Sequence, residues 1–155
     1  MLRRASWLLR WFGAFKVPLI GYCRPRVTSL DEESVSITIP LRRRTRNHLG
    51  SMYFGALAVG ADVAGGSLAV FLADKRKLKI SVAFKTVSGE FFKRPQHDVV
   101  FTCNDGRTIS AMITEAKESG ERINRPIQVS AHCPAQFGDE VVALFKLVLS
   151  LKMVK

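Results

Sequence analysis

Apolar residues recur at every second position in several segments of the chain, a pattern typical of strands that bury one face. In segment 34–41 one face carries Val35, Ile37 and Ile39, and the other carries serine and threonine. Pro40 predicts that this strand lies at an edge or ends there, because proline donates no backbone hydrogen bond. Further strands are predicted in segments 79–94, 98–104, 123–133 and 145–153.

The later part of the chain adds three finer predictions. Gly89 interrupts the alternation of segment 79–94, which predicts a bulge at that position. Ser150 lies between two lysines on the face opposite the leucines of segment 145–153, so we expect it to face water. From Thr108 the apolar positions follow the spacing i, i+3, i+4 and i+7, which predicts a short surface helix that ends at Gly120.

The segment from Asn47 to Ala73 contains 27 residues and one formal charge, that of Asp62. Its later part interleaves glycine and alanine with leucine and valine, so apolar positions occur on all sides, as in a helix surrounded by protein. Each glycine lowers helix propensity by about 1 kcal/mol relative to alanine. Close packing against a sheet, rather than local preference, is therefore expected to hold this long central helix.

The first twenty residues combine a basic start with an apolar run in which Trp7, Trp11 and Phe15 recur every four positions. This spacing predicts an N-terminal amphipathic helix over residues 1–20 that ends near Pro18. Cations interrupt the run, which is too short to span a bilayer, so a signal peptide is disfavoured and a cytoplasmic location favoured. We favour a helix packed on the domain over one bound to anionic lipid, although its basic residues permit both.

The order of these elements predicts an α+β fold in which an antiparallel sheet wraps around one long central helix, with the extra N-terminal helix outside. The 155 residues fit a single domain, 1–155, with enough apolar content for one core. The three cysteines are far apart and form no CxxC pair, so we interpret them as free thiols. No metal-ligand spacing is present among the histidines and cysteines, and we predict no metal and no organic cofactor.

Asp62 is the first candidate for chemistry. Burial of an ionised carboxylate without partners is costly, and it raises the pKa toward the range of a general base. The unpaired N–H groups at the start of the helix, near Met52 to Gly55, could stabilise an oxyanion. They lie roughly 10 to 15 Å from Asp62 along the same helix, so a two-fold related subunit would be needed to unite them. The alternative is a structural acid that bonds a neighbouring strand.

The segment from Thr45 to Gly55, followed by Asp62, resembles the hotdog-fold thioesterases. It is most similar to the PaaI-like branch and to a domain described only as one of unknown function, DUF4442. Asn47, Gly50, Gly55 and Asp62 match the pattern, while the segment Tyr53-Phe54 replaces the family's histidine and first glycine. The resemblance implies a hotdog fold that assembles as a homodimer or tetramer, with the acid acting across the subunit interface.

The resemblance also implies roles for single residues in hydrolysis of an acyl-CoA thioester. Asp62 is the base or nucleophile, Asn47 positions the substrate or the attacking water, and the backbone N–H groups of Phe54 and Gly55 polarise the carbonyl. Substrate contacts are expected from Gly50, Ser51, Tyr53, Lys93 and Arg94. Two of these residues have ordinary structural interpretations: Asn47 as a helix N-cap, which the sequence by itself favours, and Tyr53 as a core tyrosine.

The chain carries 24 Lys and Arg against 13 Asp and Glu, a net charge of +11. The cations cluster at 42–46, 75–79 and 93–94, where they could hold the phosphates of coenzyme A. An unspecific solvated surface is the alternative. Nucleic acid is a weaker rival, because no recognition motif accompanies the charge.

Two other functions of the same fold stay open. A non-catalytic acyl-CoA or fatty-acyl binding protein would keep the apolar tunnel and basic rim, and Tyr53-Phe54 in place of His-Gly favours it. A dehydratase is the less favoured alternative. His48 precedes Asp62 by 14 residues, as in the hotdog dehydratases, but the residues around it differ from theirs.

Overall fold

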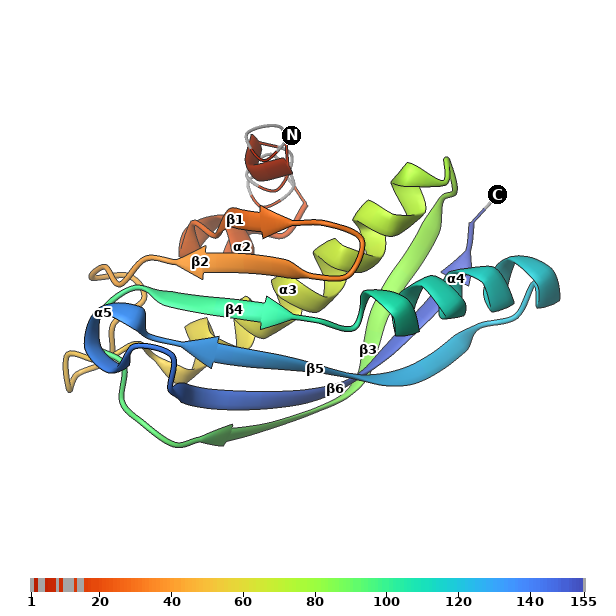
Figure 1. Cartoon of the computed structure of the whole chain (residues 1–155). Coiled ribbons are helices and arrows are strands. Elements are labelled where there is room, and N and C mark those ends of the chain that lie inside the picture. The colour runs from red at the N-terminus through yellow and green to blue at the C-terminus, as the bar shows by residue number, and fades with distance from the viewer. Residues whose placement is uncertain (1, 3–4, 8, 10–12, 14–15, 155) are drawn as a thin grey trace.

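A computed structural model describes residues 2, 5–7, 9, 13 and 16–154 of the chain. Six antiparallel strands form one sheet in the order β1-β2-β4-β5-β6-β3, with one long helix against it (Figure 1). The strands are β1 (Arg26–Leu30), β2 (Val35–Ile39), β3 (Ile80–Phe91), β4 (Val99–Cys103), β5 (Ile123–His132) and β6 (Val141–Met153). The helices are α2 (Pro18–Cys23), α3 (Phe54–Lys75), α4 (Gly106–Ser119) and α5 (Pro134–Phe137).

The core lies between α3 and the concave face of the sheet. α3 contacts five of the six strands, and its buried side is built of alanine, glycine and leucine. The largest wholly buried side chains of the strands include Phe145 and Phe101, and the Phe101 ring packs against Gly60 of α3. This is the hotdog arrangement that the sequence predicts, with the central helix wrapped by an antiparallel sheet.

α4 covers the end of the sheet where β5 and β6 extend beyond α3 (Figure 1). It buries Ile109, Met112, Ile113 and Ala116, the apolar positions that the spacing predicts. Gly120 ends the helix in the left-handed conformation, with φ of 72°, as expected for a glycine C-cap.

Two elements near the N-terminus were not predicted. Lys16 and Val17 are not helical, and Pro18 begins a further helix, α2, at a position where the missing proline N–H has no helical partner. β1 is a strand that periodicity did not reveal, since Val27 is the only one of its five residues that is buried. Of the predicted N-terminal helix, Ala5 to Trp7 are helical, while Trp11 and Phe15 lie outside the described residues.

Two predictions about strand detail are wrong. The irregularity of β3 falls between Phe84 and Thr86, whereas Gly89 stays in register opposite Phe145. A Cβ at Gly89 would lie 3.0 Å from the Phe145 ring, so the glycine makes room for that ring rather than for a bulge. Ser150 is buried, not exposed, and its hydroxyl accepts a hydrogen bond of 3.2 Å from Arg122.

In the described part of the chain, α3 is the one helix long and apolar enough to cross a membrane. In its most apolar stretch 61% of the residues are buried inside the protein, which is the property of a core helix.

Close packing at Gly60 generates the first prediction. A Cβ added there would overlap the Phe101 ring, whereas one added at Gly66 meets nothing within 4 Å. We expect Gly60→Ala to lower the free energy of unfolding by about 1–3 kcal/mol, as overpacking does. The control Gly66→Ala should raise it by up to about 1 kcal/mol through helix propensity. Urea denaturation followed by circular dichroism measures both, and equal effects of the two variants would refute the packing argument.

Candidate functional site

The start of α3 is fixed by backbone contacts to two distant segments. The N–H of Met52 donates to the Pro95 carbonyl at 2.8 Å, and that of Tyr53 donates to the Thr45 carbonyl at 2.8 Å. Thr45 is itself buried, and its hydroxyl donates to the Pro40 carbonyl at 2.8 Å. The loop between β2 and α3 and the loop between β3 and β4 therefore meet at the helix N-terminus.

Asn47 does not cap α3, so the N-cap interpretation is wrong. Its side-chain oxygen accepts hydrogen bonds from the N–H groups of Leu49 at 2.9 Å and Ser51 at 3.1 Å, while its amide lies 3.0 Å from the Ser51 hydroxyl. Gly50 has φ of 80°, a conformation that glycine adopts readily. Asn47, Gly50 and Ser51 thus build one tight turn just before the helix, because the side chain bonds its own loop first.

The N-cap position of α3 belongs to Tyr53, whose side chain makes no capping hydrogen bond. The first intrahelical bond runs from the Leu57 N–H to the Tyr53 carbonyl at 3.1 Å. Within the described residues, the N–H groups of Phe54, Gly55 and Ala56 have no acceptor. Three donors at the positive end of a 22-residue helix are therefore available to an anion or a polarised carbonyl.

Two exposed aromatic rings border these donors. The Tyr53 and Phe54 rings pack at a tilted angle with centroids 4.8 Å apart. A Cβ at Gly55 would lie 2.5 Å from the Tyr53 ring, so this ring rests directly over the glycine. Tyr53 is 49% exposed, and the interpretation of it as a core tyrosine is wrong.

Asp62 lies two turns beyond Gly55 on the same side of α3, about 10 Å along the helix axis. Burial raises the pKa of its carboxyl, and desolvation is the sole cause of the shift. Within the described residues the carboxylate has no hydrogen-bond donor and no cation beside it. The side of α3 that carries it is half-buried or exposed at Val59, Gly66 and Val70, so this acid faces outward among small apolar residues.

The basic residues near the start of α3 differ in whether an acidic side chain already pairs with them. Arg46 forms an isolated β-bridge with Met52. Arg94 directly precedes Pro95, whose carbonyl accepts the Met52 N–H. Both arginines therefore lie beside the free N–H groups at the start of α3. Both are exposed, and neither has an acidic partner among the described residues. Sequence reasoning counted Arg46 only as part of a cluster, because its pairing with Met52 arises from the folded loop.

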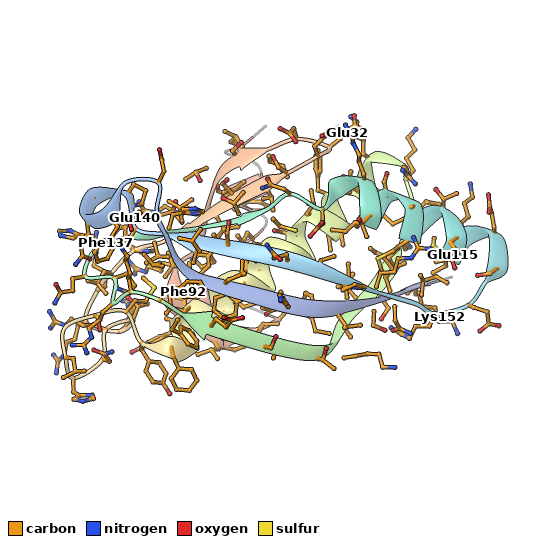
Figure 2. All side chains as sticks on the ribbon, turned by 60° about the horizontal axis from the view of Figure 1, so that its bottom comes forward. Glu32, Phe92, Glu115, Phe137, Glu140 and Lys152 are labelled. Carbon is orange, nitrogen blue, oxygen red and sulfur yellow. The ribbon has the colours of Figure 1, made fainter. Side chains whose placement is uncertain are left out.

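Lys93 is engaged elsewhere. Its ammonium forms an ion pair with Glu140 and lies 4.9 Å from the centroid of the Phe137 ring. Phe92, Phe137 and Glu140 lie at the same end of the molecule in Figure 2. The structure therefore leaves Arg94, rather than Lys93, free to meet an anion.

The cysteines offer no nucleophile here. All three are buried and free, and burial raises the pKa of Cys23 and, to about 11, that of Cys103. A thiol with a raised pKa is protonated at neutral pH and reacts slowly. Among the described residues no group of three His, Cys, Asp or Glu side chains is placed to hold a metal ion.

One edge of the sheet is long and carries exposed apolar side chains. β3 is the last strand, and among the described residues its 12 positions face a partner, β6, on one side only. Val87 is 62% exposed there, and Phe91 and Phe92 are also exposed. Proteins rarely leave such an edge uncovered, because it offers a template for another strand.

Comparisons with known proteins agree on the fold. A search of curated proteins finds no match. A Pseudomonas aeruginosa protein of unknown function, described as a probable thioesterase, is 24% identical, with a TM-score of 0.77 and 96% of both chains covered. A thioesterase from Haemophilus influenzae is 12% identical, with a TM-score of 0.69 over 99% of this chain and 91% of that one. A protein of unknown function from Chlorobaculum tepidum reaches 0.83 at 12% identity, covering 97% and 96%.

Likeness at these identities shows a shared fold. The family follows from a separate match, in which the model of the domain of unknown function DUF4442 covers residues 5–143. That range includes the turn around Asn47, the donors at the start of α3, and Asp62. The chain belongs to the DUF4442 family.

Proposed function

We propose that this protein hydrolyses an acyl-CoA thioester to a carboxylic acid and free coenzyme A. One observation carries the proposal: unpartnered N–H groups begin the central helix, and an outward-facing acid with a raised pKa lies on the same helix face. The first feature suits the oxyanion of acyl transfer, and the second suits a general base. The thioesterase descriptions of two proteins with this fold agree with the proposal.

In the proposed reaction, the thioester carbonyl accepts hydrogen bonds from the N–H groups of Phe54 and Gly55. The Asp62 carboxylate takes a proton from water as the water oxygen attacks the carbonyl carbon. The tetrahedral oxyanion collapses, the carbon–sulfur bond breaks, and the coenzyme A thiolate leaves and takes up a proton. Donors aimed at a developing oxyanion supply roughly 3 kcal/mol each in other acyl-transfer enzymes. Asp62 could alternatively attack the carbonyl itself as a nucleophile, with water then hydrolysing the resulting anhydride.

The acid and the donors must come from two subunits, since about 10 Å separates them along one helix. The free edge of β3 supplies a surface for a second copy, which would continue the sheet and cover the apolar side of α3. A homodimer formed there would bring the Asp62 of one subunit toward the donors of its partner. A tetramer would repeat the same interface.

Asn47, Gly50 and Ser51 support this site as a turn that shapes the loop before the donors. The Tyr53 ring covers Gly55 and would border the acyl group. Arg94 and Arg46 flank the helix start, where they would meet the phosphates of coenzyme A. Lys93 would contribute only if its ion pair with Glu140 opened.

Replacement of the acid tests the chemistry. Asp62→Asn should lower kcat on acyl-CoAs by about 10²–10⁴-fold, the usual contribution of a general base. Wild-type activity should rise with pH through an apparent pKa above the ordinary aspartate value of 3.8, and the variant should lose that limb. Thiol release across acyl chains of increasing length measures both.

Asp74→Asn is the matched control, because Asp74 is an exposed acid on the same helix. It should retain wild-type turnover. Full activity in Asp62→Asn would refute the proposed role. Binding of acyl-CoA by the wild type without any turnover would instead favour the non-catalytic acyl-binding function.

The arginine beside the helix start generates a second test. Arg94→Gln should raise KM for an acyl-CoA about 10- to 100-fold, because a charge-assisted hydrogen bond to phosphate contributes about 1.5–3 kcal/mol. The same acyl group on N-acetylcysteamine, which has no phosphate, should be hydrolysed equally by both proteins. A similar loss on both substrates would show that Arg94 supports the fold rather than the phosphates.

The assembly can be tested at the sheet edge. Wild-type protein should show at least twice the 17.3 kDa mass of one chain in light scattering. Val87→Lys should dissociate it and abolish turnover, since like charges would meet across the new strand pair. Val154→Lys, an exposed valine outside the strands, controls for added charge. A monomeric wild type at micromolar concentration would contradict the two-subunit site.

A further inference from the structure

α2 presents apolar side chains on two neighbouring sides, one buried and one exposed. Ile20 and Cys23 are buried, and they attach the helix to the core. Leu19 and Tyr22 are three residues apart, so they share a neighbouring side, where they are 62% and 54% exposed. These two large apolar side chains point to solvent from a six-residue helix, so they do not stabilise the core. In Figure 1 this helix lies behind the hairpin of β1 and β2.

Cations surround this apolar pair. The Arg44 guanidinium lies 5.1 Å from the centroid of the Tyr22 ring and 3.4 Å from the Tyr22 carbonyl, to which it donates. Lys16 and Arg24 are exposed at the two ends of α2. These residues, Lys16, Leu19, Tyr22, Arg24 and Arg44, are named the α2 face.

Acidic residues do not neutralise the α2 face. The first thirty residues contain six arginines and lysines and no aspartate or glutamate. The next acids, in the turn between β1 and β2, are used elsewhere. Glu32 pairs with Lys75, Glu33 pairs with Arg107, and Asp31 accepts hydrogen bonds from its own turn.

We propose that the α2 face docks this protein on an anionic lipid bilayer. Leu19 and Tyr22 would enter the interfacial layer, where an aromatic ring with a polar end is favoured. Lys16, Arg24 and Arg44 would meet lipid phosphates and carboxylates. A second copy of the chain suits this surface poorly, because the same cations would face one another across the contact.

This surface overlaps residues 1–20 only at Lys16 and Leu19. Its apolar side chains belong to α2, which the sequence did not predict as a helix, and not to the predicted amphipathic helix of Trp7, Trp11 and Phe15. The inference is independent of the proposed hydrolase activity, since the variants that test it leave Asp62, Arg46, Arg94 and the start of α3 unchanged.

The test is sedimentation of the full chain with vesicles of phosphatidylcholine containing about one third phosphatidylserine. The double variant Leu19→Ser, Tyr22→Ser keeps the net charge, so it separates apolar insertion from simple attraction of a basic protein. We expect its partition coefficient to fall at least tenfold. Val154→Ser, which removes an exposed apolar side chain elsewhere, should bind as the wild type does.

Two charge variants test whether a cation of the α2 face contributes to binding. Arg24 and Lys77 are both exposed cations in the left-handed conformation, with φ of 52° and 57°. Arg24→Gln should weaken binding to the anionic vesicles severalfold, whereas Lys77→Gln should change it much less. Binding should also fall as salt is raised, and pure phosphatidylcholine vesicles should bind weakly.

Three results would overturn the proposal. One is equal binding of the wild type and the Leu19→Ser, Tyr22→Ser variant, and another is equal loss in Arg24→Gln and Lys77→Gln. The third is a smaller mass of the apolar variant in light scattering, which would assign the face to a second copy. Circular dichroism of each variant should match that of the wild type, so that a loss of binding is not a loss of folding. Hydrolysis of a soluble short-chain acyl-CoA should be unchanged in the double variant, so the two proposals fail separately.

Discussion

The structure depends on the close approach of one helix to a curved sheet. α3 contains four glycines, each of which lowers helix propensity by about 1 kcal/mol relative to alanine, so local preference contributes little to this helix. The same small residues let strand side chains come near its backbone: Gly60 accommodates the Phe101 ring, and a Cβ at Gly65 would lie 2.7 Å from Ile127. Tertiary packing therefore creates the helix, and with it the direction of its dipole and the place of its N-terminus.

That dependence explains why the helix start can remain uncapped. An exposed N-terminus without a side-chain cap costs about 1 kcal/mol, and α3 has none at Tyr53. The residues before it are fixed instead by the Thr45 and Pro95 carbonyls, which take the N–H groups of Tyr53 and Met52. The next three donors are left free at a defined position. A cap would satisfy one of them, and it would occupy the space where a carbonyl could bind.

The periodicity of apolar residues predicted the elements that line the core, because a strand or helix that buries one face must repeat its apolar residues. It therefore found β2 to β6, α3 and α4, but it missed β1, where only Val27 is buried. It also failed where contacts join distant segments. Asn47 has the side chain of an N-cap, yet its partners lie within its own turn, and the link from Met52 to Pro95 leaves no local pattern. The candidate site therefore combines a local turn around Asn47 with tertiary contacts, such as that from Met52 to Pro95, that no local pattern predicts.

Unlike the packed residues of α3, Asp62 does not stabilise the folded chain at neutral pH. Its folded pKa is raised by burial, so the folded protein binds the proton more tightly than the unfolded chain does. Stability is then greatest below the unfolded value of 3.8, falls as pH rises through the raised value, and stays reduced at neutral pH. A carboxylate retained under those conditions, on the outward side of the packed helix, stabilises nothing in the single subunit. The proposed role as a general base in a two-subunit site accounts for an acid at this position.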